Sequence, residues 1–242
     1  MIPLRDTIPT REFPITTWLL IIINGAVFLI ELSLPNRALT ALFYHLGVVP
    51  ARYSDPLWAL SHGLSSNNYL PFLTNMFLHG GWMHIISNMW TLYLFGDNVE
   101  DRMGHIRFFL FYILSGLAAS LTHYIFNMGS TVPAIGASGA IAGVMGAYFI
   151  LFPHSRVITL IPILFLPYFI EIPAFVYLWV WFISQLFSGT FSILAPEAGG
   201  GIAWWAHIGG FVAGILMLPL FKKRKGLYRR YYPDELYQDV YF

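Results

Sequence analysis

The sequence PAIGASGAIAGVMGAY, from Pro133 to Tyr148, places one serine, Ser138, among glycines and alanines at the start of an apolar stretch. Small residues then recur every three or four positions, at Gly139, Gly143 and the pair 146–147. On a membrane helix this spacing forms a smooth stripe, against which a second helix can approach until the two backbones touch. The stretch therefore predicts a close helix crossing with a hydroxyl at its edge.

A second stripe of small residues lies in AHIGGFVAG, at Ala206, Gly210 and Gly214, which are four residues apart. His207 is next to this stripe. If the two stripes cross, an imidazole is brought to the Ser138 hydroxyl inside a membrane.

The composition is that of an integral membrane protein. Of 242 residues, 57% are hydrophobic and 10% are charged, against about 45–50% and about 25% in soluble domains. The net charge of +1 gives no case for a nucleic-acid partner. Because the chain has no cysteine, disulfides, thiolate metal sites and a cysteine nucleophile are excluded. The start of the sequence shows no cleavable signal peptide, so we expect the first span to be retained.

Six stretches have the length and hydrophobicity of membrane helices, some of them short. The sequence thus predicts an all-α membrane protein with six transmembrane helices, at about Thr16–Leu34, Gly81–Gly96, Ile106–Phe126, Ser138–Phe152, Ile172–Gly189 and Ile202–Phe221.

Another apolar run, Val157–Ile170, is not counted as a span, because Pro162 and Pro167 would break a helix there. We expect it to be an interfacial or re-entrant connection. Glu171 and Pro173 then indicate the start of the fifth helix.

The basic residues predict the topology. Eleven of the 13 lie on one side of the six spans, and only Arg37 and Arg52 lie on the other, so both termini are predicted to be cytoplasmic. This divides the chain into a cytoplasmic segment (1–15), a six-helix membrane domain (16–221) and a basic, aromatic cytoplasmic tail (222–242). The tail is also expected to bind anionic lipids. The location we expect is a prokaryotic inner membrane.

The same topology places Ser138, His207, His84 and Asn88 in the outer half of the membrane, on three different helices. Ser138 alone is most simply a packing residue, but an ionisable group such as His207 inside a membrane usually marks function. The two residues form a candidate catalytic dyad with Ser138 as nucleophile and His207 as base. The predicted helices that carry them contain no carboxylate, so this dyad has no acidic third member.

Donors for an oxyanion are expected from the second span. In HGGWMHIISNMW, His84 and Asn88 are four residues apart and share a helix face. The amide N–H of Ser138, at a helix start, is a third donor. An equally simple interpretation makes His84 and Asn88 a pair that joins helices by hydrogen bonds.

Other chemistries find less support. The sequence has no HExxH motif and no second intramembrane aspartate beside Asp97, which disfavours metallo- and aspartyl proteases. We expect neither a metal nor a cofactor.

Four motifs together resemble those of the rhomboid intramembrane serine proteases, and the resemblance covers nearly the whole chain. They are HGGWMHIISN, EDRMG, GASGAIAG with Gly136, and WWAHIGGFVAG. The resemblance implies a six-helix bundle with a protruding first loop, the nucleophile Ser138, the base His207 and an oxyanion site of His84, Asn88 and the Ser138 amide.

The sequence departs from that family in two places. Some members carry an aromatic residue four positions after the serine, stacked on the histidine, where this chain has Ala142. The resemblance therefore does not say what orients His207. The tryptophan–arginine pair of some first loops has no clear counterpart either.

We thus expect a protease that cuts transmembrane segments of other membrane proteins near their outer end. Phe175, Trp179 and Phe182 on the fifth span form either a lateral gate or a lipid-facing surface. The alternative functions are a catalytically silent relative that escorts membrane clients, and a transporter. The sequence does not indicate the oligomeric state.

Overall fold

The computed structural model describes residues 2–163, 166–194 and 202–223. Its longer helices are α1 (Ile15–Ser33), α2 (Asn36–Leu46), α6 (Trp82–Met103), α7 (His105–Phe126), α8 (Ser138–Leu151), α9 (Ala174–Leu194) and α10 (Trp204–Phe221). The shorter elements are α3 (Ala51–Ser54), α4 (Pro56–Ser61), α5 (Pro71–Thr74), the 3-10 turn η1 (Asn75–Phe77) and the strands β1 (Ile2–Asp6), β2 (Arg156–Ile163) and β3 (Leu166–Pro173).

Four of the described helices are long and apolar enough to cross a membrane: α1, α7, α9 over Ala174–Ser192, and α10. The apolar α8 has only 14 residues. The helix α6 has 22, but its C-terminal turns carry several charged residues, among them Glu100. Each of the six predicted segments overlaps one of these helices. The chain is an integral membrane protein of mostly helical structure.

The prediction that the protein is all-helical is wrong at one end of the molecule. Residues predicted to be an interfacial connection form an antiparallel hairpin of β2 and β3, and the N-terminal β1 adds a third strand beside β2. Valine, isoleucine, threonine and aromatic residues favour strands, and the third strand gives a hairpin the support that it lacks alone. Pro162 pairs with Pro167 near the turn. The fifth helix accordingly begins at Ala174 and not at Ile172, which lies in β3.

The start of α1 is fixed by a buried carboxylate on α6. Glu100 is 2% exposed and accepts hydrogen bonds from the backbone N–H groups of Thr16 and Thr17, both at 2.8 Å. It also accepts one from the Thr17 hydroxyl at 2.7 Å. The first N–H groups of a helix have no partner within it, and they form the positive end of its dipole. The glutamate of the EDRMG motif thus caps the neighbouring helix.

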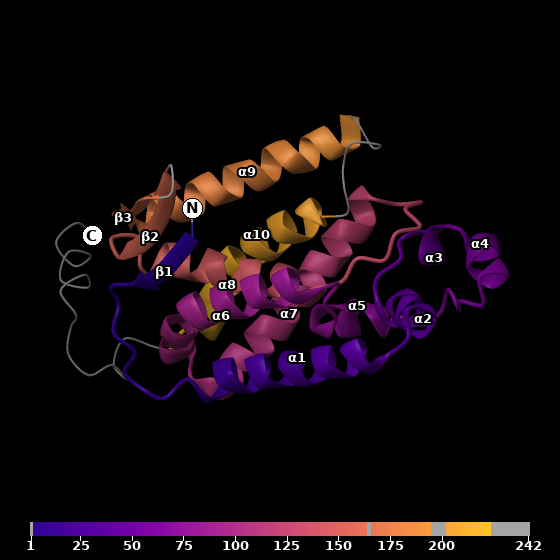
Figure 1. The fold of residues 1–242 in the computed structure, drawn as a ribbon, viewed down its shortest axis with the longest axis horizontal. Helices are drawn as coiled ribbons and strands as arrows, with labels where there is room; N and C mark the ends of the chain where they lie inside the picture. Colours follow the sequence, from indigo (N-terminus) through magenta and orange to yellow (C-terminus); the bar gives the residue numbers. More distant parts are fainter. Residues whose placement is uncertain (1, 164–165, 195–201, 224–242) are drawn as a thin grey trace.

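The helices are arranged around α8. Figure 1 shows α8 and α10 in the middle of the bundle, α1 and α9 on opposite sides, the sheet at one end and α2 to α4 at the other. The helix α8 packs mainly on α10, α7 and α6. Ten of its residues, from Gly139 to Tyr148, are buried. The short apolar helix α8 therefore lies at the centre of the bundle.

The segment between α1 and α5 folds onto the rest of the protein through α2 to α4. Arg52 is 2% exposed and donates to the carbonyl oxygens of Ser65 and His45, at 2.8 and 3.1 Å. Val48 and Ala134 exchange two backbone hydrogen bonds, of 3.0 and 2.8 Å. These bonds connect this segment to the one that leads into Ser138.

Candidate active site

The two stripes of small residues lie against each other where α8 crosses α10. A methyl group added to Gly210 would overlap the carbonyl oxygen of Gly139, and one added to Gly214 would overlap that of Gly143. The backbones are thus in contact at two successive turns. Only hydrogen atoms fit between them, so glycine is required on α10 at both positions.

This crossing brings the predicted serine and histidine together. The hydroxyl oxygen of Ser138, at the first residue of α8, lies 2.8 Å from Nε2 of His207 on α10. The two residues are 69 positions apart in the chain. At this distance a hydroxyl donates a hydrogen bond to an unprotonated imidazole nitrogen. The geometry is that of a nucleophile beside its base.

The other ring nitrogen of His207 has a partner that was not predicted. Oε1 of Gln185, on α9, lies 2.8 Å from Nδ1 of His207. Gln185 is only 5% exposed. A lone glutamine in an apolar span is the signal that could have identified it, because buried amides need partners. Its partner lies on another helix, which spacing alone does not reveal.

His84 faces the same place from α6. The backbone N–H of Gly80 donates to its Nδ1 at 3.3 Å, so the neutral ring carries its proton on Nε2. That Nε2 lies against Gly136, whose φ of 125° belongs to the region that glycine adopts readily. A side chain at Gly136 would meet both the His84 ring and, at 3.7 Å, the Ser138 hydroxyl oxygen. Gly136 thus lies between Nε2 of His84 and the Ser138 hydroxyl.

Asn88 lies one turn further along α6 and is 6% exposed. Its amide nitrogen is buried, and no group in the described part of the chain accepts a hydrogen bond from it. A buried donor without a partner is costly, and it is typical of a site that binds an acceptor from outside. The amide nitrogen of Asn88 is therefore a donor that an acceptor from outside the chain could use.

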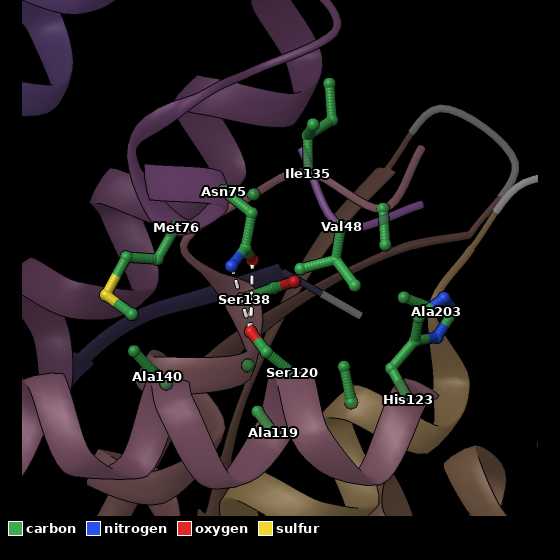
Figure 2. Close-up of a pocket in the computed structure, with 15 residues that line it drawn as sticks. Val48, Asn75, Met76, Ala119, Ser120, His123, Ile135, Ser138, Ala140 and Ala203 are labelled. Atoms are coloured by element: carbon green, nitrogen blue, oxygen red, sulfur yellow. Dashed lines mark hydrogen bonds between the residues drawn. The ribbon is translucent and has the colours of Figure 1, made fainter. Parts of the chain in front are cut away.

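A small cavity, of about 20 Å³, lies beside Ser138 and is shown in Figure 2. Ser138 lines it together with three polar residues, Asn75, Ser120 and His123. Asn75 donates to the Ser120 hydroxyl at 2.9 Å. A cavity with polar walls and at least about 10–15 Å³ of room holds one water. This cavity is therefore large enough, and its walls polar enough, to hold one water near Ser138.

The aromatic residues predicted to line one face of the fifth span lie along the contact of α9 with α8 and α10. Phe182 is 9% exposed and stacks on Phe211 of α10, with ring centroids 4.7 Å apart. Phe175 and Trp179 are both 47% exposed, and both rings also contact Phe149 of α8. These contacts fit either prediction, a lateral gate or a lipid-facing surface.

Within the described residues no cluster of three or more His, Asp or Glu side chains has the arrangement of a metal site. The described residues form an integral membrane protein in which a serine and a histidine are hydrogen-bonded inside a helical bundle.

Comparison with known proteins gives the family: a model of the rhomboid domain matches residues 66–224. The chain belongs to the rhomboid family.

Three curated relatives illustrate the similarity. The chain is 30% identical over 160 residues to RHOMBOID-like protein 6, mitochondrial, of Arabidopsis thaliana, over 64% of this chain and 44% of that protein. It is 28% identical to Rhomboid protein 1, mitochondrial, of Saccharomyces cerevisiae, over 61% of this chain and 40% of that protein. It is also 28% identical to the protein named Putative rhomboid protease YdcA of Bacillus subtilis, over 57% and 62% of the two chains. The matches thus span 40 to 62% of the length of these relatives.

Proposed function

We propose that this protein is an intramembrane serine endopeptidase that hydrolyses peptide bonds in or near the transmembrane segments of other membrane proteins. The observation that carries the proposal is the 2.8 Å contact between the Ser138 hydroxyl and Nε2 of His207 across the α8–α10 crossing. The proposal includes six membrane crossings. Four are made by the long apolar helices, and the other two by α6, which is charged at its C-terminal end, and by the short helix α8.

In the proposed reaction, His207 takes the proton of Ser138 as the serine oxygen attacks the substrate carbonyl carbon. Negative charge then develops on the carbonyl oxygen, which three donors stabilise: Nε2–H of His84, Nδ2–H of Asn88 and the backbone N–H of Ser138. His207 returns the proton to the leaving amine, and water releases the acyl group by the same steps. The 20 Å³ cavity beside Ser138 is the proposed source of that water.

The substrate enters from the side of the bundle in this proposal. Backbone hydrogen bonds protect the peptide bonds of an intact membrane helix, so a substrate must unwind before Ser138 can reach a carbonyl. Glycine and other residues that weaken helices favour such unwinding. The support for this route is the row of aromatic residues on α9, of which Phe175 and Trp179 are exposed.

The test is hydrolysis of transmembrane substrates by purified protein, together with labelling by a fluorophosphonate. Ser138→Ala and His207→Ala should each abolish cleavage while the protein remains folded, because the two residues act as a unit. His84→Ala and Asn88→Ala should lower turnover about 10²-fold, as loss of one oxyanion donor does. Cleavage by Ser138→Ala at the wild-type rate would contradict the proposal. An inactive wild type that still binds transmembrane segments would favour the client-escort alternative.

We also propose that both termini are cytoplasmic, that the protein resides in a cell membrane of prokaryotic type, and that the chain divides at residues 15 and 221. The support is the distribution of basic residues. Most of the tail, 224–242, lies outside the described residues. Since the chain has no cysteine, single replacements test the topology. An impermeant thiol reagent should label Thr131→Cys from outside and Glu171→Cys only after the membrane is opened. The reverse pattern would overturn the orientation.

A further inference from the structure

We propose that Gln185 is a positioning residue for His207: its carbonyl oxygen keeps the imidazole proton on Nδ1 and so leaves Nε2 free for the proton of Ser138. This inference rests on the proposed function, because it assigns a role within the same site. It adds a third side chain, from a third helix, to the Ser138–His207 pair.

The orientation of the Gln185 amide follows from its neighbours. Its nitrogen lies 3.2 Å from the carbonyl oxygen of Trp181 and 2.9 Å from the hydroxyl oxygen of Ser184. That hydroxyl in turn donates to the Trp181 carbonyl at 2.6 Å, so its lone pairs face Gln185. Both neighbours of the amide nitrogen are therefore acceptors. The NH₂ group must point toward them, and Oε1 must point toward His207.

The tautomer of His207 follows from that orientation. Oε1 can only accept a hydrogen bond, so at 2.8 Å the Nδ1 atom of His207 must be the donor. A neutral imidazole has one proton, and Nε2 is then unprotonated. That nitrogen lies 2.8 Å from the Ser138 hydroxyl oxygen. The hydroxyl therefore donates to the nitrogen that must take its proton.

The neighbouring aromatic rings cannot supply this selection. The rings of Trp181 and Trp204 lie 5.9 and 6.2 Å from the His207 ring, centroid to centroid. Such contacts restrain the plane of the imidazole but treat its two nitrogens alike. Ala142, four residues after the serine, offers no ring. Of the described contacts to Nδ1 of His207, the one with Gln185 distinguishes the two tautomers.

Gln185 does not itself exchange a proton in the reaction. When Ser138 attacks, its proton moves to Nε2 and the ring becomes an imidazolium with an N–H on each side. The Nδ1–H remains hydrogen-bonded to Oε1 throughout, and the Nε2–H passes to the leaving amine. A neutral amide acceptor is sufficient for this role. Because Gln185 belongs to α9, the site has its active arrangement only while α9 lies against α10.

The experiment compares substitutions at Gln185 in the full-length protein in detergent. Gln185→Leu keeps the volume but removes the acceptor, and Gln185→Met does so with a more flexible side chain. Both should slow fluorophosphonate labelling and substrate cleavage about 10- to 100-fold, as lost support of a functional histidine typically does. Gln185→Glu keeps an acceptor and should be clearly faster than either. Ser192→Ala removes a hydroxyl that bonds only within α9, to the Gly189 carbonyl at 2.7 Å, and should match wild type.

A second measurement reads the tautomer directly. In ¹⁵N-histidine spectra, the His207 signals, identified by their loss in His207→Asn, should show a protonated Nδ1 and an unprotonated Nε2 in wild type. Gln185→Leu should show a mixture of tautomers. Labelling of Gln185→Leu at the wild-type rate, or equal rates for Gln185→Glu and Gln185→Leu, would overturn the inference. If wild type is not labelled at Ser138 at all, the proposed function fails instead, and the spectra still decide the role of Gln185.

Discussion

The two helices that contact His207 from either side are held in different ways. The helix α8 meets α10 backbone to backbone, with Gly210 and Gly214 against carbonyl oxygens of α8. The helix α9 meets α10 through large rings, such as Phe182 on Phe211. A backbone contact cannot adjust to an added atom, whereas stacked rings can shift. The Ser138–His207 bond therefore depends on the rigid contact, and the Gln185–His207 bond on the adaptable one.

The largest effect should come from adding one methyl group to the rigid contact. Gly210→Ala places a Cβ where the Gly139 carbonyl oxygen lies, so the helices must separate. We expect a loss of about 1–3 kcal/mol in the free energy of unfolding. Cleavage should fall by about 10²-fold or more, because a displacement near 1 Å disrupts catalytic geometry. Thermal unfolding and cleavage rates in detergent measure the two effects.

The matched control for this substitution is Gly25→Ala on α1, where an added Cβ meets nothing within 4 Å. Alanine is the better helix former, so this variant should be as stable as wild type or slightly more stable. If Gly210→Ala behaved in the same way, the contrast between a rigid and an adaptable contact would be lost.

An effect on stability alone, and not on the helix crossing, is expected at the sheet that supports the start of α9. Asp6 of β1 accepts a hydrogen bond from Asn98 of α6 at 2.8 Å and another from the hydroxyl of Tyr148 on α8. Burial raises the pKa of Asp6 to about 7, against the opposing effect of the Tyr148 bond. The folded protein therefore binds this proton more tightly than the unfolded chain, whose carboxyl has a pKa near 3.9.

The sign of the pH dependence follows from linkage. The stabilisation is fully present below pH 4 and is lost as the pH rises through 7. Each unit of pKa difference is worth about 1.4 kcal/mol. The unfolding temperature should thus decrease as the pH is raised from 5 to 8. In Asp6→Asn this decrease should be smaller. Equal slopes for wild type and Asp6→Asn would show that the carboxyl does not anchor the sheet.

The smallest effect should come from the adaptable contact itself. Phe182→Leu removes the ring stacked on Phe211 but keeps an apolar side chain, so we expect a loss of about 0.5–1.5 kcal/mol. Fluorophosphonate labelling should fall less than in Gly210→Ala, since the α8–α10 crossing is untouched. Phe187→Leu, on the same helix but 74% exposed, should change neither quantity. A loss of labelling in Phe182→Leu as large as in Gly210→Ala would mean that both contacts are equally rigid.

The parts of the molecule that the sequence predicts well are those set by local spacing. The start of α8 at Ser138 and the approach of His207 to Ser138 both follow from small residues repeated every three or four positions. Such stripes in membrane helices indicate close packing against a second helix. The pairing of β2 with β1 could not be obtained in this way. It depends on residues 2–6, which are about 150 positions away from β2. In addition, Pro162 and Pro167 made the run Val157–Ile170 look unlike a pair of strands.

Gln185 escaped prediction for a related reason. Its hydrogen bond joins residues 22 positions apart on two helices, and its direction depends on how α9 rotates. Ala142 indicated that something other than an aromatic ring must orient His207. A single side-chain contact between two helices leaves no periodic pattern in the sequence. The sequence therefore raised the question of what orients His207, and the structure identifies Gln185 as its partner.

The 14 residues of α8 also determine how far along a substrate the cut bond would lie. At 1.5 Å per residue the helix is about 21 Å long, roughly 9 Å less than the hydrocarbon core of a bilayer. If the end of α8 near Arg156 lies at one membrane surface, as the proposed topology requires, Ser138 lies that far beneath the opposite surface. About six residues of a helical substrate cover this distance, but only about three of an extended one. In the proposed reaction, an unwound substrate is therefore cut about three residues closer to the end of its membrane segment than a helical one. In a thinner bilayer Ser138 lies nearer the surface, so the cut bond is closer still to that end.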